Sequence, residues 1–232
     1  MEAQLKRFVT DLHLPLSQVR LDSYRSPVSP DDDMEMLTNY FWDIDLAESL
    51  VPSIHAVELA VRNSIHAVLT TEYGTAMWFY KPGLLRAPQL EMLASGLEKL
   101  SRKKVDATSD RIVGALMFGF WVSLLTGPYE QVIWQPDGYR RLYAAFPHAS
   151  PMTRKQVHTH LDKIRELRNR VFHHEDIWSR RDLKSEHTQI HEAIRWISPT
   201  LHKAIHAVDN FQTTLGARAD VQNGLKAHLG VP

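Results

Sequence analysis

The sequence predicts an all-α protein, and three observations support this class. Apolar residues recur at intervals of three and four along most of the 232 residues. Strand-like alternation is nearly absent, and its best short candidate, Val132–Trp134, is weak. No long Pro/Gly/Ser linker, charge block or low-complexity tract divides the chain. We therefore expect one helical domain over residues 1–232.

Composition excludes several classes of protein. Hydrophobic residues make up 44% of the chain and charged residues 23%, which is ordinary for a globular protein and excludes bulk disorder. The absence of cysteine excludes disulfide scaffolds, thiolate zinc sites and cysteine nucleophiles. Because 27 Lys+Arg balance 27 Asp+Glu, broad non-specific coating of nucleic acid is disfavoured, whereas a local anion site is not. The 13 histidines make the chain cationic as the pH falls through about 6.5.

Three helices are predicted in the first third of the chain. Residues 1–12 have apolar positions at helical spacing and no continuous apolar core, so they predict an amphipathic helix and not a signal peptide. Ser29–Asp32 supplies an N-cap, a proline and acidic residues ahead of an apolar stretch through Leu50. Another helix is expected from about Ser53 to Gly74, where glycine suits the C′ position.

The middle of the chain contains its longest apolar run. Pro88–Leu100 carries leucines on one helical stripe, and Arg102–Asp110 is expected to be a polar connector. Ile112–Leu125 is too short to cross a bilayer of about 30 Å, so we interpret it as a buried core helix. Thr126–Tyr139 contains Gly-Pro and Pro-Asp-Gly turns. These features predict a cytoplasmic protein with no membrane partner.

Further helices are predicted toward the C-terminus. Thr153–Gln156 is a capping box that opens a helix running past Leu167. From Ile190 to Val208 the apolar residues again step by three and four. Ser198-Pro199 interrupts that pattern, so a kink or a restart is expected there.

The densest group of functional side chains lies at Arg165–Glu175, on the continuation of the capped helix. It combines guanidinium groups suited to a phosphate with imidazoles suited to proton transfer. Asn169 and His173 share one face of a continuing helix, but Arg168 and His173 diverge by about 140°. For both to reach one phosphate, the helix must distort or a second copy must complete the site. A charged helix end that favours the macrodipole is the simpler alternative.

This segment resembles a known family. Arg168-Asn169-x-x-x-His173 matches the R-N-x-x-x-H form of the Rx4–6H motif of the HEPN superfamily, and Leu167–Glu175 is similar to its Abi-like (abortive-infection) branch. Two further segments agree in order, and the resemblance spans about residues 40–177. These are the E-x-x-x-R-N helix at Glu58–Ile65, followed by Tyr73-Gly74 and Trp78, and the F-G-x-W-x-x-L-L block at Phe118–Leu125, followed by Trp134.

The resemblance implies a HEPN-like helical bundle, with an N-terminal helical extension over 1–39 and C-terminal helices over 185–232. It implies a metal-independent endoribonuclease of phage defence or a toxin, with RNA as substrate and no cofactor or metal. A homodimer with facing motifs and a possible antitoxin or regulatory protein are the implied partners. Arg168 would bind the phosphate, His173 would transfer protons and Asn169 would orient its neighbours. The possible supporting residues are His174, Glu175, Arg170, Glu58, Arg62 and Asn63.

Other interpretations remain open. The chain can be a non-catalytic HEPN-type module that binds RNA or a protein, since zero net charge gives no broad cationic footprint. Glu58 and Arg62 form either an intrahelical ion pair or a brace for the second motif. His187-x-x-x-His191 with Glu192, to which His158-x-His160 adds further imidazoles, suggests a histidine-ligated metallohydrolase, which is the least favoured hypothesis. The aromatic residues Phe118, Phe120 and Trp121 are expected in the core, and Arg102-Lys103-Lys104 in a solvated turn.

Overall fold

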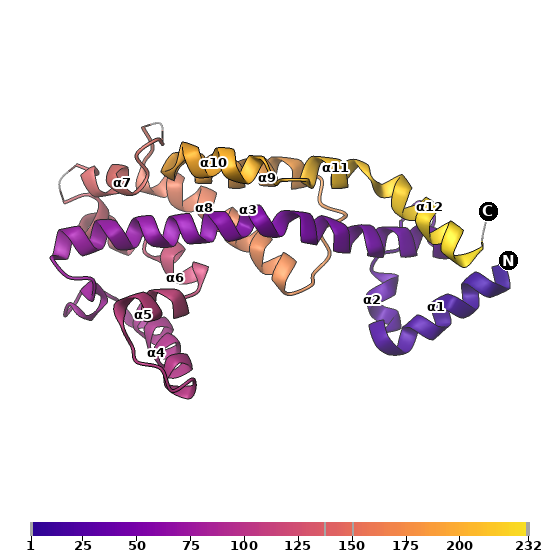
Figure 1. Cartoon of the computed structure of the whole chain (residues 1–232), viewed down its shortest axis with the longest axis horizontal. Helices are drawn as coiled ribbons and strands as arrows, with labels where there is room; N and C mark the ends of the chain where they lie inside the picture. Colours follow the sequence, from indigo (N-terminus) through magenta and orange to yellow (C-terminus); the bar gives the residue numbers. More distant parts are fainter. Residues whose placement is uncertain (1, 137, 150, 231–232) are drawn as a thin grey trace. The chain divides into compact units, whose positions relative to one another are not determined.

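The predicted all-α class is confirmed. The computed structural model describes residues 2–136, 138–149 and 151–230, and apart from one isolated bridge between Ser26 and Ser29 this part of the chain contains no strand (Figure 1). Val132–Trp134, the strand candidate, lies in a π-helix. The elements are α1 (Glu2–Leu16), α2 (Gln18–Asp22), α3 (Asp33–Tyr73), η1 (Trp78–Tyr80), α4 (Ala87–Arg102), α5 (Ser109–Ala115), α6 (Phe118–Ser123), η2 (Gly127–Tyr129), η3 (Glu130–Trp134), α7 (Arg140–Ala145), α8 (Arg154–Phe172), α9 (Leu183–Ile197), α10 (Pro199–His206), α11 (Phe211–Gly216) and α12 (Arg218–Leu229).

The chain forms two compact units, each assembled from segments that are distant in sequence. Unit 1 comprises Met1–Pro52, Arg168–Ser185 and Val208–Pro232, and unit 2 comprises Ser53–Leu167 and Glu186–Ala207. Helices α3 and α8 contribute residues to both units. The expectation of a single domain stays a prediction. Among the described residues, no helix has both the length and the apolar character needed to cross a membrane.

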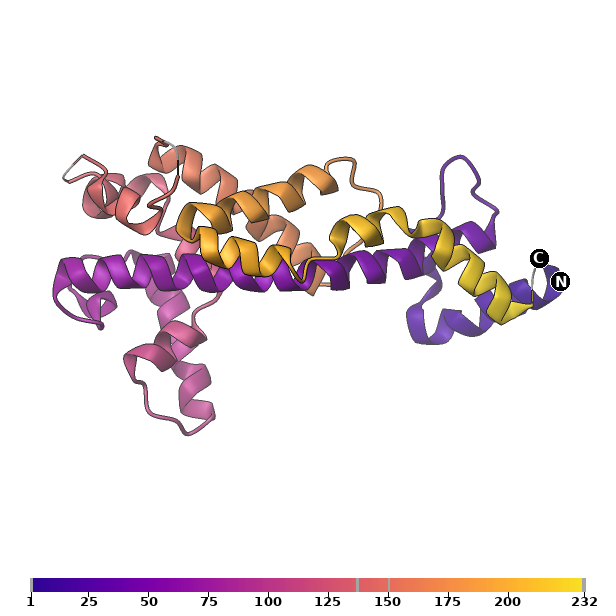
Figure 2. The same cartoon turned by 45° about the horizontal axis from the view of Figure 1, so that its top comes forward.

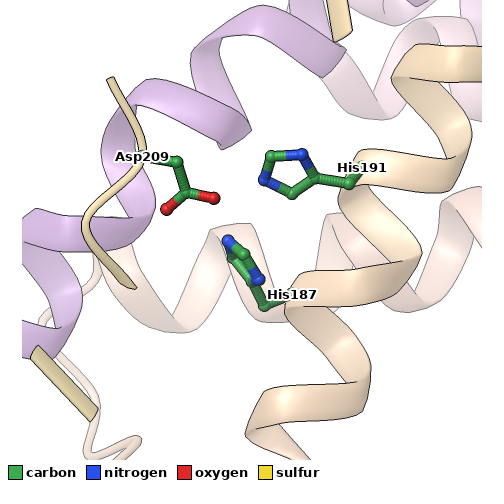
Figure 3. Close-up of side chains that lie close together, drawn as sticks. All are labelled: His187, His191 and Asp209. Carbon is green, nitrogen blue, oxygen red and sulfur yellow. The ribbon is translucent and has the colours of Figure 1, made fainter. Parts of the chain in front are cut away.

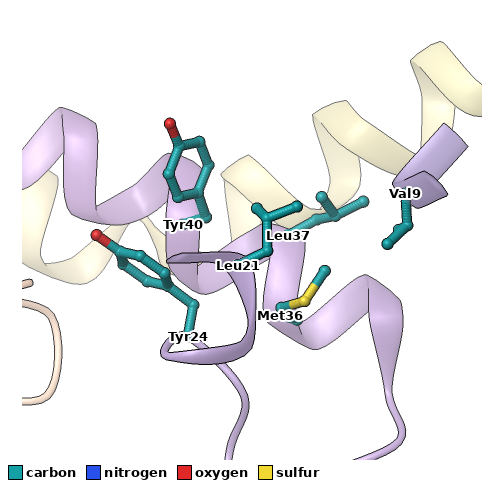
Figure 4. Close-up of a cluster of buried hydrophobic side chains, with 6 residues drawn as sticks. All are labelled: Val9, Leu21, Tyr24, Met36, Leu37 and Tyr40. Atoms are coloured by element: carbon teal, nitrogen blue, oxygen red, sulfur yellow. The ribbon is translucent and has the colours of Figure 1, made fainter. Parts of the chain in front are cut away.

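Unit 1 is built around a small apolar cluster between α1, α2 and the start of α3 (Figure 4). The partly buried side chains of Leu5, Phe8 and Leu12 pack against this cluster, which confirms the amphipathic helix expected at the N-terminus. The start of α1 and the end of α12 approach each other (Figures 1 and 2), and Gln4 Nε2 donates to the Leu229 carbonyl there at 3.0 Å. The buried members of the cluster are Val9, Leu21, Tyr24, Met36, Leu37 and Tyr40.

Helix α3 departs from the predicted pattern at its start and in its middle. Asp32, and not Ser29, caps its N-terminus, because Asp32 Oδ1 accepts the Glu35 amide at 2.9 Å. Two helices were expected on either side of Pro52, but the structure has one helix of 41 residues. Proline removes only one backbone donor, and apolar residues are buried on both sides of Pro52, so packing maintains the helix. The expected end is confirmed: α3 stops at Tyr73 and Gly74 has φ +67°.

Aromatic side chains form the core of unit 2 and join the sequence blocks around Trp78 and Trp121. The indole Nε1 of Trp78 donates to His66 Nδ1 at 3.0 Å, and the Trp78 and Trp121 rings are 6.2 Å apart. Phe118, Phe120 and Trp121 are buried, so the prediction that they belong to the core is confirmed. His66 therefore acts as a half-buried acceptor for a buried indole.

The apolar run Ile112–Leu125 is not one helix. It is divided between α5 and α6, because Leu116 and Met117 adopt extended backbone conformations. Leu116 and Phe118 are buried while Met117 is 56% exposed, so the short extended segment places alternate residues in and out of the core. Burial of side chains in the core thus breaks the expected helix at Leu116 and Met117.

The other predicted elements of unit 2 are mostly confirmed. In α4, Leu93 and Leu100 are buried, but Leu90 is 48% exposed and lies outside the expected stripe. The connector, including Arg102–Lys104, is exposed as expected. The segment after Leu125 is broken into short 3-10 and π turns, and Asp137 of the predicted turn lies outside the described residues.

The capping signals near the C-terminus are also confirmed. Thr153 Oγ1 accepts the Gln156 amide at 3.3 Å, and Gln156 Oε1 accepts the Thr153 amide at 2.8 Å. The chain restarts at Ser198-Pro199, where Ser198 Oγ accepts the Leu201 amide at 3.1 Å and opens α10. Val208 lies beyond α10 and is 64% exposed, so the apolar pattern ends before it.

Two half-buried histidines give unit 2 a predictable response to acid. Burial lowers the pKa values of His66 and His160 below their usual value of 6.5. A lowered pKa in the folded state means that the unfolded chain binds more protons, so stability is present above pH 6.5 and is lost as the pH falls. We expect the urea midpoint of unfolding to decrease from pH 7.5 to pH 5.5. A midpoint that rises over this range contradicts the expectation.

Candidate functional site

The Arg168–Glu175 segment lies in unit 1 at the C-terminal end of α8. The helix ends at Phe172, so Asn169 lies in its last turn and His173 directly follows it, with the His173 amide donating to the Asn169 carbonyl at 2.8 Å. His174 has φ +57°, its amide donates to the Val171 carbonyl at 3.3 Å, and the Glu175 amide donates to the Arg170 carbonyl at 2.9 Å. This pair of bonds is a Schellman motif, which closes the helix and turns the chain sharply at His174.

Arg168 and His173 both have contact with solvent. The guanidinium carbon of Arg168 lies 4.6 Å from the centre of the Phe172 ring, and Arg168 Nη1 lies 3.5 Å from Asn169 Oδ1. Arg168 and Asn169 are half-buried, whereas His173 is exposed. Contact with the face of the Phe172 ring restricts the orientation of the Arg168 guanidinium. The end of α8 therefore presents an oriented guanidinium, and the residue directly after the helix presents an accessible imidazole.

Arg170 contacts the loop that follows the helix. Its Nη1 atom lies 3.4 Å from the Asp176 carbonyl and 3.7 Å from Glu175 Oε2. Both side chains of the Arg170–Glu175 pair are substantially exposed, so this ion pair contributes little to stability. Its effect is to hold two of the predicted supporting residues against each other.

Arg20, from α2, belongs to the same site although no sequence pattern pointed to it. Arg20 Nη2 donates to the His174 carbonyl at 2.6 Å. Its guanidinium lies 6.0 Å from the Tyr24 ring centre and 5.9 Å from that of Tyr40. A positive charge on the terminal carbonyls of a helix is favourable because of the helix dipole. Arg20 thus adds a third arginine to the end of α8.

Asp43 fixes the backbone that follows the motif. Its Oδ1 atom accepts the amides of Ile177 at 2.7 Å and Trp178 at 2.8 Å, and its Oδ2 atom accepts the Tyr24 hydroxyl at 2.9 Å. The Tyr24 and Trp178 rings also stack, with centres 6.4 Å apart. A buried carboxylate with three donors holds the chain that follows the motif in place against α3 and Tyr24.

Burial has the largest effect on the pKa values of Asp43 and Tyr24. Loss of solvent raises the pKa of Asp43 above its usual value, against the opposing effect of the three donors. Burial and the neighbouring Asp43 carboxylate together raise the pKa of the Tyr24 hydroxyl well above its ordinary range. The hydroxyl therefore stays protonated and remains a donor.

Glu58, Arg62 and Asn63 lie on α3 in unit 2. Arg62 Nε donates to Asn63 Oδ1 at 3.1 Å. The Arg168–Glu175 segment belongs to unit 1, so a brace between the two motifs stays a prediction.

Other histidines of unit 2 fall into two groups. His160 is part of the packing: its Nε2 atom lies 2.8 Å from the Gln189 carbonyl, and its ring lies 4.3 Å from that of Trp196. His187 and His191 project from α9 with their rings close together (Figure 3). Ligand nitrogens of this second pair are near enough to each other to hold one metal ion.

Comparison of the chain with protein-family models, with curated proteins and with solved structures found no match. A function for the chain is therefore inferred from its all-α class, from the contacts at the end of α8 and from the motif that these contacts surround.

The left-handed conformation of His174 makes a specific prediction. A side chain at positive φ costs free energy that glycine does not pay, and glycine is the preferred residue at this position of a Schellman motif. We expect His174→Gly to increase the free energy of unfolding by about 1 kcal/mol, measured by urea denaturation. The control is His173→Gly, next to it, which is expected to decrease stability. An unchanged or lower stability of His174→Gly contradicts this account of the turn.

Proposed function

We propose that the protein is a metal-independent endoribonuclease whose active site includes Arg168, Asn169 and His173. The observation that carries the proposal is that the end of α8 holds an arginine oriented over Phe172 and is followed directly by an exposed histidine. Arginine suits a phosphate because its planar fork donates two hydrogen bonds and stays charged. Histidine suits proton transfer near neutral pH.

The reaction is attack of a ribose 2′-hydroxyl on the adjacent phosphorus. The new bond joins the 2′-oxygen to phosphorus, the bond from phosphorus to the 5′-oxygen breaks, and the products are a 2′,3′-cyclic phosphate and a 5′-hydroxyl. Arg168 stabilises the charge that develops on the phosphoryl oxygens. One group must remove the 2′-proton and another must protonate the leaving 5′-oxygen. His173 supplies one of these groups and water supplies the other; a homodimer with facing motifs brings Arg168 of one copy to His173 of the other.

RNA affinity in this proposal comes from a local group of arginines. The chain has zero net charge, but Arg20, Arg168 and Arg170 all belong to the end of α8 and its surroundings. Three cations on a single strand predict a slope of about −2 for log K against log salt. A role in phage defence or as a toxin, with a regulatory protein that blocks this surface, is the part of the proposal supported by the resemblance alone.

The decisive experiment incubates the purified protein with total RNA in EDTA and identifies the ends of the products. Fragments with 2′,3′-cyclic phosphate and 5′-hydroxyl ends are expected. RNA binding without turnover would show a non-catalytic binding module instead. Cleavage that is abolished by EDTA and restored by a divalent ion would overturn the proposal.

A further inference from the structure

A group of four histidines lies on α9 and α10, outside the Arg168–Glu175 segment of the sequence. His187 and His191 are one turn apart on α9, and His202 and His206 are one turn apart on α10. All four belong to unit 2. Figure 3 shows the rings of His187 and His191 projecting from one side of α9. Asp209, which is also drawn there, belongs to unit 1, and the histidine group is built from unit 2 alone.

The spacing of the rings suits a shared metal ion. A ligand nitrogen of His187 and one of His191 lie within 4.8 Å of each other. The ring centres of His187 and His191 are 4.5 Å apart, and those of His191 and His202 are 5.4 Å apart. A Zn–N bond of about 2.1 Å with tetrahedral angles places two imidazole centres about 5 Å apart. The two observed separations lie on either side of that value, and the imidazoles whose ligand atoms lie within 4.8 Å of each other are those of His187 and His191.

The burial of the histidine rings also favours a metal site. His187 and His191 are only 5% and 8% exposed. Two imidazoles this close and this buried are costly to charge together, and neutral imidazole is the form that binds metals. His202 is half-buried, and the exposed His206 lies 6.0 Å from His191, centre to centre. The group thus has a buried interior and an accessible side.

We propose that His187, His191 and His202 form a binding site for a divalent transition-metal ion of the zinc class. The ligands are all imidazoles, which favour zinc, copper, nickel and cobalt over magnesium and calcium. The ion connects α9 to α10 across the break at Ser198-Pro199 and fixes the angle between the two helices. The role of the ion is structural. The site is independent of the proposed function, because the RNA cleavage proposed at the end of α8 needs no metal.

The test is a Zn²⁺ titration of the full-length protein after removal of metal with EDTA, by competition with a chromogenic chelator. One high-affinity Zn²⁺ per chain is expected, together with a higher Tm in its presence. His187→Gln and His191→Gln are each expected to weaken binding at least about tenfold, the scale by which even outer-shell changes weaken metal sites. His55→Gln is the matched control, because His55 is exposed on α3 in the same unit.

Two measurements keep the result independent of folding. Circular dichroism of each metal-free variant verifies its helix content, and Co²⁺ in place of Zn²⁺ reports tetrahedral coordination by its visible absorption. Zn²⁺ binding of wild type no tighter than that of the double variant His187→Gln/His191→Gln overturns the proposal, and so does an equal loss in His55→Gln. Wild-type RNA cleavage in EDTA does not affect it, so this site and the proposed function fail separately.

Discussion

Replacement of His173 by alanine is expected to lower the rate of RNA cleavage by about 10²–10⁴-fold, the usual contribution of general acid–base catalysis. His173 is exposed at the end of α8 and only its backbone amide takes part in the turn, by donating to the Asn169 carbonyl at 2.8 Å. Removal of the imidazole therefore leaves the fold intact. The measurement is the initial rate of cleavage of one labelled RNA in EDTA, with thermal unfolding measured in parallel.

The matched control is His228→Ala, because His228 is an exposed histidine of α12 in the same unit. It should leave the rate unchanged. A His173→Ala variant that cleaves RNA as fast as wild type removes His173 from the mechanism.

A mixture of two inactive variants tests whether the site is shared between copies. If Arg168 of one copy works with His173 of the other, each Arg168→Ala/His173→Ala heterodimer keeps one intact site. Random mixing in equal amounts makes half of the dimers heterodimers, so about a quarter of the wild-type activity should return. No recovery, with dimers verified by mass, means that both residues act within one copy.

The sequence predicted the helices of this chain well where the determining interactions are local. The Thr153–Gln156 capping box, Gly74 after α3 and the restart at Ser198-Pro199 depend on residues within one helical turn, and all three are confirmed. The errors arose where tertiary packing decides the outcome. Pro52 lies inside a helix held by buried residues on both sides, and Ile112–Leu125 breaks so that Leu116 and Phe118 are both buried.

The same distinction applies to the candidate site. The motif at Arg168–His173 is contiguous, so the sequence was sufficient to single it out. Arg20 and Asp43 are separated from the residues they contact by 154 and 134 positions, and neither belongs to a local pattern. Only the fold brings them to the end of α8. An isolated arginine or aspartate in a helical segment is most often a surface residue, so no sequence signal distinguishes these two.

Asp43→Ala is expected to destabilise unit 1 by about 3 kcal/mol or more, because three donors lose their acceptor at once. The Ile177 amide is buried, the Trp178 amide is partly buried, and the Tyr24 hydroxyl lies in the apolar cluster. Each unsatisfied buried donor costs about 1–3 kcal/mol. The measurement is the free energy of unfolding in urea, and an effect below about 1 kcal/mol contradicts the anchoring role.

Asp43→Asn separates the hydrogen bonds from the charge. Both amides donate to Oδ1, which asparagine retains, and its NH₂ group can donate to the Tyr24 oxygen in place of Oδ2. Stability within about 1 kcal/mol of wild type is therefore expected. Because the pKa of Asp43 is raised in the folded state, this carboxyl group adds stability as the pH falls toward 3.8, and the asparagine variant lacks that gain. Equal destabilisation by alanine and asparagine would show that the negative charge, and not its acceptor geometry, holds the turn after His173.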